Sequence, residues 1–156
     1  MIEIDIPGNK KIRIEHLVLD FNGTLAIDGK LIPGTKQLLE MLIKQLRVHV
    51  ITADTFGNSQ KELEGIACSH VVISLSEQDA QKARYVTDLG SEHVVAIGNG
   101  QNDTLMLRKS AIGIMVVQQE GAFGKLFNDA DIVCFSIYDA LSLMLNPLRI
   151  TATLRK

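Results

Sequence analysis

The apolar and polar positions of the chain alternate near its start. Ile2, Ile4 and Ile6, and then Ile12 and Ile14, are separated by polar residues on either side of a turn at Pro7-Gly8-Asn9. A period of two around a turn is typical of a β-hairpin with one face in water. The pattern therefore predicts an N-terminal hairpin over residues 1–15, which we expect to be an ancillary element outside the core.

Four short and uninterrupted apolar runs follow, and each contains or begins with a histidine. They cover residues 16–19, 48–51, 70–73 and 93–97. Runs of this kind are typical of strands buried on both faces of a parallel sheet. Segments with helical spacing lie between them, at residues 38–46 and 80–89. Alternating strands and helices predict an α/β fold, with three α/β/α layers around a mainly parallel, Rossmann-like sheet.

The same alternation continues to the C-terminal part of the chain. Residues 112–117 and 131–135 are expected to be strands, and a helix is expected around residues 141–145, ahead of Pro147. The irregular spacing gives no repeat, so we expect a single domain over residues 1–156. The tail, residues 147–156, has apolar residues and basic terminal charges. It could pack on a sister subunit, pack on its own sheet or fray.

Composition narrows the classes of partner. Lys and Arg number 16 against 18 Asp and Glu, charged residues make up 22% and Trp is absent. This near balance gives no electrostatic footprint for nucleic acid or an anionic membrane. Cys68 and Cys134 are far apart, which favours two reduced thiols. Because the chain shows neither a signal peptide nor an apolar stretch of membrane-spanning length, we expect a cytoplasmic protein.

Polar and acidic residues follow three of the predicted strands. These segments are Asp20–Thr24, Thr52–Thr55 and Gly98–Asp103. Ligands of open parallel sheets bind at the carboxyl ends of the strands, so we expect the three segments to form one site. The histidines are expected at the opposite ends of the strands, where a structural role is favoured over a metal cluster.

Two of these segments, and Lys82, also have a purely structural explanation. Asn22-Gly23 between apolar residues is a strong hairpin signal. The glycines of residues 98–103 permit a tight turn in which Asn102 or Asp103 caps a helix starting near Thr104. That segment does not match a dinucleotide-binding motif, since Asp103 occupies the third glycine position. Lys82, which we expect to open a helix, has the alternative of a solvated surface lysine.

Taken in chain order, these features resemble the haloacid dehalogenase superfamily of phosphohydrolases and phosphotransferases. The matching features are Asp20 followed by Gly23-Thr24, a strand-end Thr52, an isolated Lys82, and the turn Gly98-Asn99-Gly100-Gln101-Asn102-Asp103. The match covers residues 16–140. Within the superfamily, the sequence of residues 20–26, 51–55 and 98–107 is most similar to soluble proteins related to the phosphorylation domain of P-type ATPases.

The resemblance implies a role for each of these residues. Asp20 would be the nucleophile that forms an aspartyl-phosphate. Substrate phosphate would be bound by Thr52, Lys82 and the segment Asn22–Thr24, together with the main-chain N–H of Ala53. The implied cofactor is Mg²⁺, held by Asp20, by the main-chain carbonyl of Asn22, and by Asn99 and Asp103. The implied partner is a phosphorylated substrate.

Two residues depart from the family pattern. Asn22 stands where the phosphatases usually have an acid that protonates the leaving group, and Asn99 stands where a metal-binding Asp is usual. General acid–base groups typically contribute about 10²–10⁴-fold to rate, so we expect a slow enzyme or a long-lived phosphoenzyme. Asp54 could substitute for the missing acid or could cap the following helix. The alternative function is a catalytically impaired phosphate-binding or regulatory module.

The spacing between the motifs leaves no room for a cap domain. Residues 25–33, with a turn at Asp28-Gly29, can form only a small hairpin flap. An uncapped site is open to water. We therefore expect either a homo-oligomer that covers the site or a macromolecular substrate.

Overall fold

The computed structural model describes residues 1–8, 10–54 and 57–156, so Asn9 of the predicted turn and Thr55 lie outside the described residues. Its centre is a six-stranded sheet in the order β10-β9-β8-β3-β6-β7, and every neighbouring pair is parallel. The strands are β3 (His16–Asp20), β6 (Arg47–Thr52), β7 (Ser69–Val72), β8 (Val94–Gly98), β9 (Ile112–Val116) and β10 (Ile132–Cys134). The expected parallel α/β architecture is confirmed.

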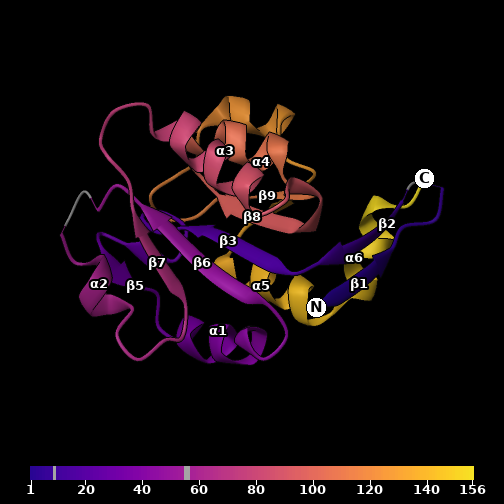
Figure 1. Ribbon diagram of the computed structural model, residues 1–156, viewed down its shortest axis with the longest axis horizontal. Helices are drawn as coiled ribbons and strands as arrows, with labels where there is room; N and C mark the ends of the chain where they lie inside the picture. Colours follow the sequence, from indigo (N-terminus) through magenta and orange to yellow (C-terminus); the bar gives the residue numbers. More distant parts are fainter. Residues whose placement is uncertain (9, 55–56) are drawn as a thin grey trace.

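Helices cover both faces of this sheet (Figure 1). One face carries α1 (Thr35–Ile43) and α5 (Ile137–Leu145), and the other carries α3 (Gln78–Asp88) and α4 (Thr104–Lys109). Alternate residues of β3 enter two separate cores: Leu17 and Leu19 pack on the α1/α5 side, and Val18 packs on the α3/α4 side. The shorter helical elements are α2 (Ser59–Glu62), η1 (Ser91–His93), η2 (Gln101–Asp103) and η3 (Gly124–Asn128).

Burial follows the place of each strand in the sheet. Every residue of β3, β8 and β9 is buried, as expected for strands covered on both faces. The run at residues 70–73 is different, because β7 is an edge strand whose residues are exposed or half-buried. Val72, for example, is 57% exposed. An apolar run therefore predicted the strand correctly but not its double-sided burial.

The N-terminal hairpin exists but is not peripheral to the core. Strands β1 (Ile2–Asp5) and β2 (Lys11–Ile14) pair antiparallel, and all five of their alternating isoleucines, Ile6 included, are buried in the α1/α5-side core. The expectation of an ancillary element is wrong, because helix α6 (Pro147–Leu154) covers the hairpin (Figure 1). The Thr151 hydroxyl donates to the Asp5 carbonyl at 2.8 Å, and Ile150 is fully buried. The C-terminal tail thus packs on its own chain.

A small flap follows β3, as predicted. Strands β4 (Ala26–Ile27) and β5 (Lys30–Leu31) form a hairpin whose turn residues Asp28 and Gly29 both have positive φ, at 50° and 73°. Two positive φ angles are typical of a type I′ hairpin turn. The competing hairpin at Asn22-Gly23 is wrong, because β3 pairs with parallel strands on both sides. Among the described helices, none is both long and apolar enough to cross a membrane.

Candidate active site

The topology brings two of the polar segments to one point. Strand order reverses between β3 and β8, which pair directly although β6 and β7 separate them in sequence. A reversal of this kind creates a crevice at the carboxyl ends of the two strands. Asp20 ends β3, and Asn99 follows the last residue of β8. Thr52 ends β6, the other neighbour of β3.

Lys82 connects two carboxylates at this crevice. Its ammonium Nζ donates to Asp20 Oδ1 at 2.6 Å and to Asp103 Oδ1 at 2.7 Å. The Lys82 side chain is 0% exposed, so the solvated-lysine alternative is wrong. Helix α3 begins at Gln78, which places Lys82 in its second turn rather than at its opening. Charge-assisted hydrogen bonds of this length are among the strong ones in proteins.

Asp103 organises the turn after β8. Its second oxygen, Oδ2, accepts from the main-chain N–H groups of Asn99 and Gly100 at 3.0 and 2.8 Å. Asp103 occupies the position preceding α4, but its side chain makes no capping hydrogen bond to that helix. A Cβ at position 98 would lie only 2.5 Å from the Asp103 carboxyl group, so Gly98 permits this close approach. The carboxylate therefore serves the site rather than the helix.

Thr24 and Asn99 complete the crevice beside Asp20. The Thr24 hydroxyl lies 3.3 Å from both Asp20 Oδ2 and Asn99 Oδ1, and it can donate to one of them at a time. The Asn99 Nδ2 donates to the Gly121 carbonyl at 3.1 Å, which turns Oδ1 toward Thr24. Gly23 has φ of 79°, and a Cβ there would lie 2.2 Å from Asn99 Nδ2. Only glycine fits at this position.

The loop after β9 supplies contacts that the sequence reasoning missed. The Gln118 Nε2 donates to the carbonyls of Gly23 and Thr24 at 3.1 and 2.9 Å. Its Oε1 accepts from the N–H of Ile137 at 2.7 Å, which ties the Asp20–Thr24 loop to the start of α5. Gln118 is a polar residue at a strand end, the same signal that identified the other three segments.

The remaining candidates lie at the same edge of the sheet with different contacts. The buried Thr52 hydroxyl accepts from the Asp54 N–H at 2.9 Å, and half-buried Ala53 lies between them. Asp54 Oδ1 accepts from the N–H of Ser59, the first residue of α2, at 3.1 Å, so Asp54 engages the helix start. The buried Asn22 Oδ1 has no hydrogen-bond partner within the described residues.

Burial and charge set the protonation of the site. Burial and then the charge of Asp103 raise the pKa of Asp20, Lys82 opposes both, and the net result is a pKa of about 7. Burial alone would lower the pKa of Lys82, but the attraction of Asp103 and Asp20 outweighs it and raises that pKa. With all three groups ionised, two carboxylates and one ammonium leave one net negative charge in a buried place.

The donor set fits a weakly held divalent cation. Asp20 Oδ2 and Asn99 Oδ1 are hard oxygen donors that share the Thr24 hydroxyl, and one net negative charge remains to be balanced. Both oxygens of Asp103 already accept hydrogen bonds, so this residue fits a supporting role better than direct ligation. No group of three or more His, Cys, Asp or Glu able to hold a metal occurs in the described ranges.

The histidines belong to other networks, consistent with the expected structural role. His16 Nδ1 and His49 Nε2 are 2.9 Å apart, and His49 Nδ1 lies 2.9 Å from the Tyr85 hydroxyl. His70 Nε2 lies 2.8 Å from the Ser59 hydroxyl. Neither network includes a residue of the candidate site.

Comparison with known proteins gives relatives at two levels. No family model matches the chain. Uncharacterized protein MJ0073 of Methanocaldococcus jannaschii is 46% identical over 65 residues, covering 42% of this chain and 70% of that protein. Uncharacterized protein MJ0072 of the same organism is 41% identical over 39 residues, covering 25% of this chain and 89% of that protein. The chain therefore belongs to the same family as MJ0073.

Solved structures identify the fold. The 3-deoxy-D-manno-octulosonate 8-phosphate phosphatase of Moraxella catarrhalis, in complex with magnesium, phosphate and the sugar acid, has a TM-score of 0.71 at 15% identity and covers 85% of this chain and 86% of its own. The cobalt-bound phosphatase of Haemophilus influenzae has a TM-score of 0.72 at 12% identity and covers 92% and 94%. A Legionella pneumophila hydrolase of haloacid dehalogenase subfamily III A has a TM-score of 0.72 at 17% identity and covers 90% and 87%. The fold is that of the haloacid dehalogenase superfamily.

Proposed function

We propose that the chain is a Mg²⁺-dependent phosphohydrolase of haloacid dehalogenase type that acts through an aspartyl-phosphate on Asp20. The observation that carries the proposal is the buried ammonium of Lys82 between Asp20 and Asp103, at the point where strand order reverses. A buried cation held by two carboxylates costs more than a well-packed apolar residue would. Phosphoryl transfer would explain this arrangement, because the reaction needs a fixed positive charge beside the nucleophile.

The proposed reaction has two displacements. A carboxylate oxygen of Asp20 bonds to phosphorus while the bond from phosphorus to the ester oxygen breaks, and the alcohol leaves. Water then attacks phosphorus, the bond to Asp20 breaks, and inorganic phosphate is released. Lys82 donates to Asp20 Oδ1 at 2.6 Å and the Thr24 hydroxyl lies 3.3 Å from Oδ2, and these two contacts orient the carboxylate for attack.

Binding of the phosphoryl group is assigned to groups that surround Asp20. Thr52 offers its hydroxyl and Ala53 its main-chain N–H at the end of the neighbouring strand, whereas the Gly23 N–H already donates to the Ala26 carbonyl at 2.7 Å. Asp20 Oδ2, Asn99 Oδ1 and the Asn22 carbonyl would hold Mg²⁺, and Asp103 would keep Lys82 and the Asn99 main chain in place. When bound, the cation would offset the negative charge of the phosphoryl oxygens.

Asn22 limits the expected rate. The side-chain amide of Asn22 is too weak an acid to protonate the departing alkoxide and too weak a base to deprotonate water. Solvent must therefore carry out both proton transfers. Loss of a general acid–base group typically costs about 10²–10⁴-fold. The Asn22 Oδ1 is buried without a hydrogen-bond partner in the described part of the chain. A carboxyl group there would be desolvated and have a raised pKa, which suits a general acid.

The same asparagines favour a second candidate, a non-catalytic phosphate-binding or regulatory module. Such a module would bind phosphate without turning over an ester. For such a module, an amide at position 20 would serve as well as the carboxylate of Asp20. The two functions therefore differ in what Asp20→Asn removes: turnover in the enzyme, and nothing essential in the module.

The test is hydrolysis of p-nitrophenyl phosphate with Mg²⁺ by wild type, Asp20→Asn, Asn22→Asp and Asp54→Asn. We expect Asp20→Asn to lose at least 100-fold in kcat and Asn22→Asp to gain about 10²-fold, in line with an added acid. Asp54→Asn is the matched control, because this nearby carboxylate engages Ser59 instead of the site. Equal rates for wild type and Asp20→Asn would refute the enzyme, and retained phosphate binding in calorimetry would then favour the module.

A further inference from the structure

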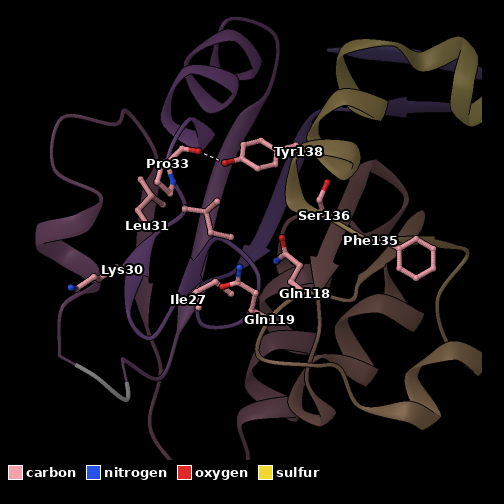
Figure 2. Close-up of a pocket in the computed structure, with 10 residues that line it drawn as sticks. Ile27, Lys30, Leu31, Pro33, Gln118, Gln119, Phe135, Ser136 and Tyr138 are labelled. Carbon is pink, nitrogen blue, oxygen red and sulfur yellow. Dashed lines mark hydrogen bonds between the residues drawn. The ribbon is translucent and has the colours of Figure 1, made fainter.

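A cavity of about 510 Å³ lies beside the candidate site, between the flap and the start of α5 (Figure 2). Its walls come from the flap, from the loop after β9 and from residues around the first turn of α5. Figure 2 shows Lys30 and Phe135 at opposite sides, with the other labelled residues between them. This volume is within the range of about 300–1,000 Å³ typical of small-molecule sites. We call it the flap cavity.

The flap cavity is built on the same loop as the candidate site. Gln118 lines it and also donates to the carbonyls of Gly23 and Thr24. Asn22 forms a bridge with Ala26, and the next residue, Ile27, lines the cavity. The wall and the Asp20–Thr24 loop are thus one continuous piece of backbone.

Burial leaves few directions for the substituent of a phosphate ester bound at Asp20. Lys82 and Asp103, on the α3/α4 side, are completely buried and bonded to one another, so a substituent cannot extend between them. The flap cavity lies on the opposite, α1/α5 side of the sheet, where Tyr138 of α5 and Pro33 before α1 form its far wall. Its volume exceeds the roughly 340 Å³ of a second hollow, which borders the turn after β8 at Gln101 and Thr104.

The residues that line the flap cavity indicate which kind of ester substituent it can bind. Ile27, Leu31, Ile32 and Pro33 give apolar surface. Three of the five polar side chains of the lining are already engaged: Gln118 by both ends of its amide, Ser136 by Asp139, and Tyr138 through its hydroxyl to the Pro33 carbonyl. The other two are Gln119 and Lys30, and Lys30 lies at the edge of the cavity (Figure 2). A ligand is therefore held here mainly by burial of apolar surface, worth about 25 cal/mol per Å².

We propose that the flap cavity binds the ester substituent of the substrate, and that the substrates are phosphate monoesters with an apolar, ring-sized substituent. This inference rests on the proposed function, since it assigns the phosphate end to Asp20. It separates the two parts of the ligand: charge is recognised at the strand ends, and apolar shape is recognised between flap and α5.

The test uses phosphonates, which bind without being hydrolysed. We expect 1-naphthylmethylphosphonate to bind the full chain at least tenfold more tightly than methylphosphonate in calorimetry with Mg²⁺, and inorganic phosphate to compete with both. Ile27→Trp and Gln119→Trp fill the cavity from different elements. Each is therefore expected to reduce the ratio of the naphthyl to the methyl phosphonate affinity at least fivefold. Leu148→Trp, on exposed α6, is the matched control and is expected to keep it.

The outcomes separate this inference from the proposed function. Three outcomes would overturn the inference, whatever the hydrolytic activity. They are equal affinities of the two phosphonates, no binding of either, and a ratio of the two affinities that neither cavity-filling variant changes. Tight naphthyl binding without hydrolysis of any ester would support the cavity and refute the enzyme. Affinity that falls with protein concentration, together with a dimer in sedimentation, would assign the cavity to a second copy and overturn the inference.

Discussion

Replacing Lys82 by Met tests the electrostatic core of the site. The substitution keeps most of the side-chain volume but removes the ammonium that lies 2.6 Å from Asp20 and 2.7 Å from Asp103. Removing one partner from a buried ionic group costs about 3–5 kcal/mol, because the other charges stay buried without compensation. The free energy of unfolding of a domain is only about 5–15 kcal/mol. For a chain of this size, the loss corresponds to a fall in Tm of roughly 6–20 °C.

The loss also has a predicted pH dependence. The folded-state pKa of Asp20 is already raised to about 7 from its usual 3.8, mainly by burial, and it rises further without Lys82. A raised carboxyl pKa gives stability that is fully present below the unfolded pKa and is lost as pH rises through the folded pKa. Lys82→Met is therefore expected to be closer to wild type at pH 5 than at pH 8 in urea unfolding.

A second substitution sharpens the assay. In Lys82→Met, Asp103→Asn keeps an oxygen for the N–H groups of Asn99 and Gly100 and removes the charge of Asp103. We expect the double variant to be more stable than Lys82→Met alone at pH 8, because only one buried charge remains without the ammonium. A cost below about 1 kcal/mol for Lys82→Met, equal at both pH values, would refute the buried three-group arrangement.

Three further predictions concern Asn99, Gly23 and His49. Asn99→Asp sets a carboxylate oxygen against the Gly121 carbonyl, so we expect a cost of about 1–3 kcal/mol that Mg²⁺ partly restores; thermal melts in which Mg²⁺ has no effect would contradict this. Gly23→Ala, at φ of 79° with 2.2 Å to Asn99, is expected to lower both Tm and kcat, and wild-type values for either would be inconsistent with the loop geometry. Burial and then the charge of His16 lower the pKa of His49 to about 4. The free energy of unfolding therefore falls as pH drops from about 6.5 toward 4, by at most about 1.4 kcal/mol per pH unit. Urea unfolding of His49→Gln should lack that component, and identical pH profiles would argue against it.

The apolar runs were sufficient to predict the layer architecture and the edge of the sheet that carries the site. Uninterrupted runs mark strands that need cover on both faces, and polar residues at their ends collect at one edge whatever the order of the strands. This is why the sequence alone predicts that Asp20, Thr52 and Asn99 lie at one edge of the sheet. The Asp28-Gly29 turn of the flap was predictable for a similarly local reason, because two consecutive positive φ angles restrict the residues that fit.

Contacts between distant segments depended on the tertiary structure. Alternating isoleucines indicate one buried face, but whether the N-terminal hairpin is peripheral depends on α6, which lies more than 130 residues away in sequence. Hydrogen bonds from Gln118 to Gly23 and from Asn99 to Gly121 leave no periodic signal, since each joins elements that meet only after the sheet forms. The sequence alone thus determined which chemical groups gather at the strand ends. Only the packed structure decided that Lys82 is buried between Asp20 and Asp103, because burial depends on what covers a side chain.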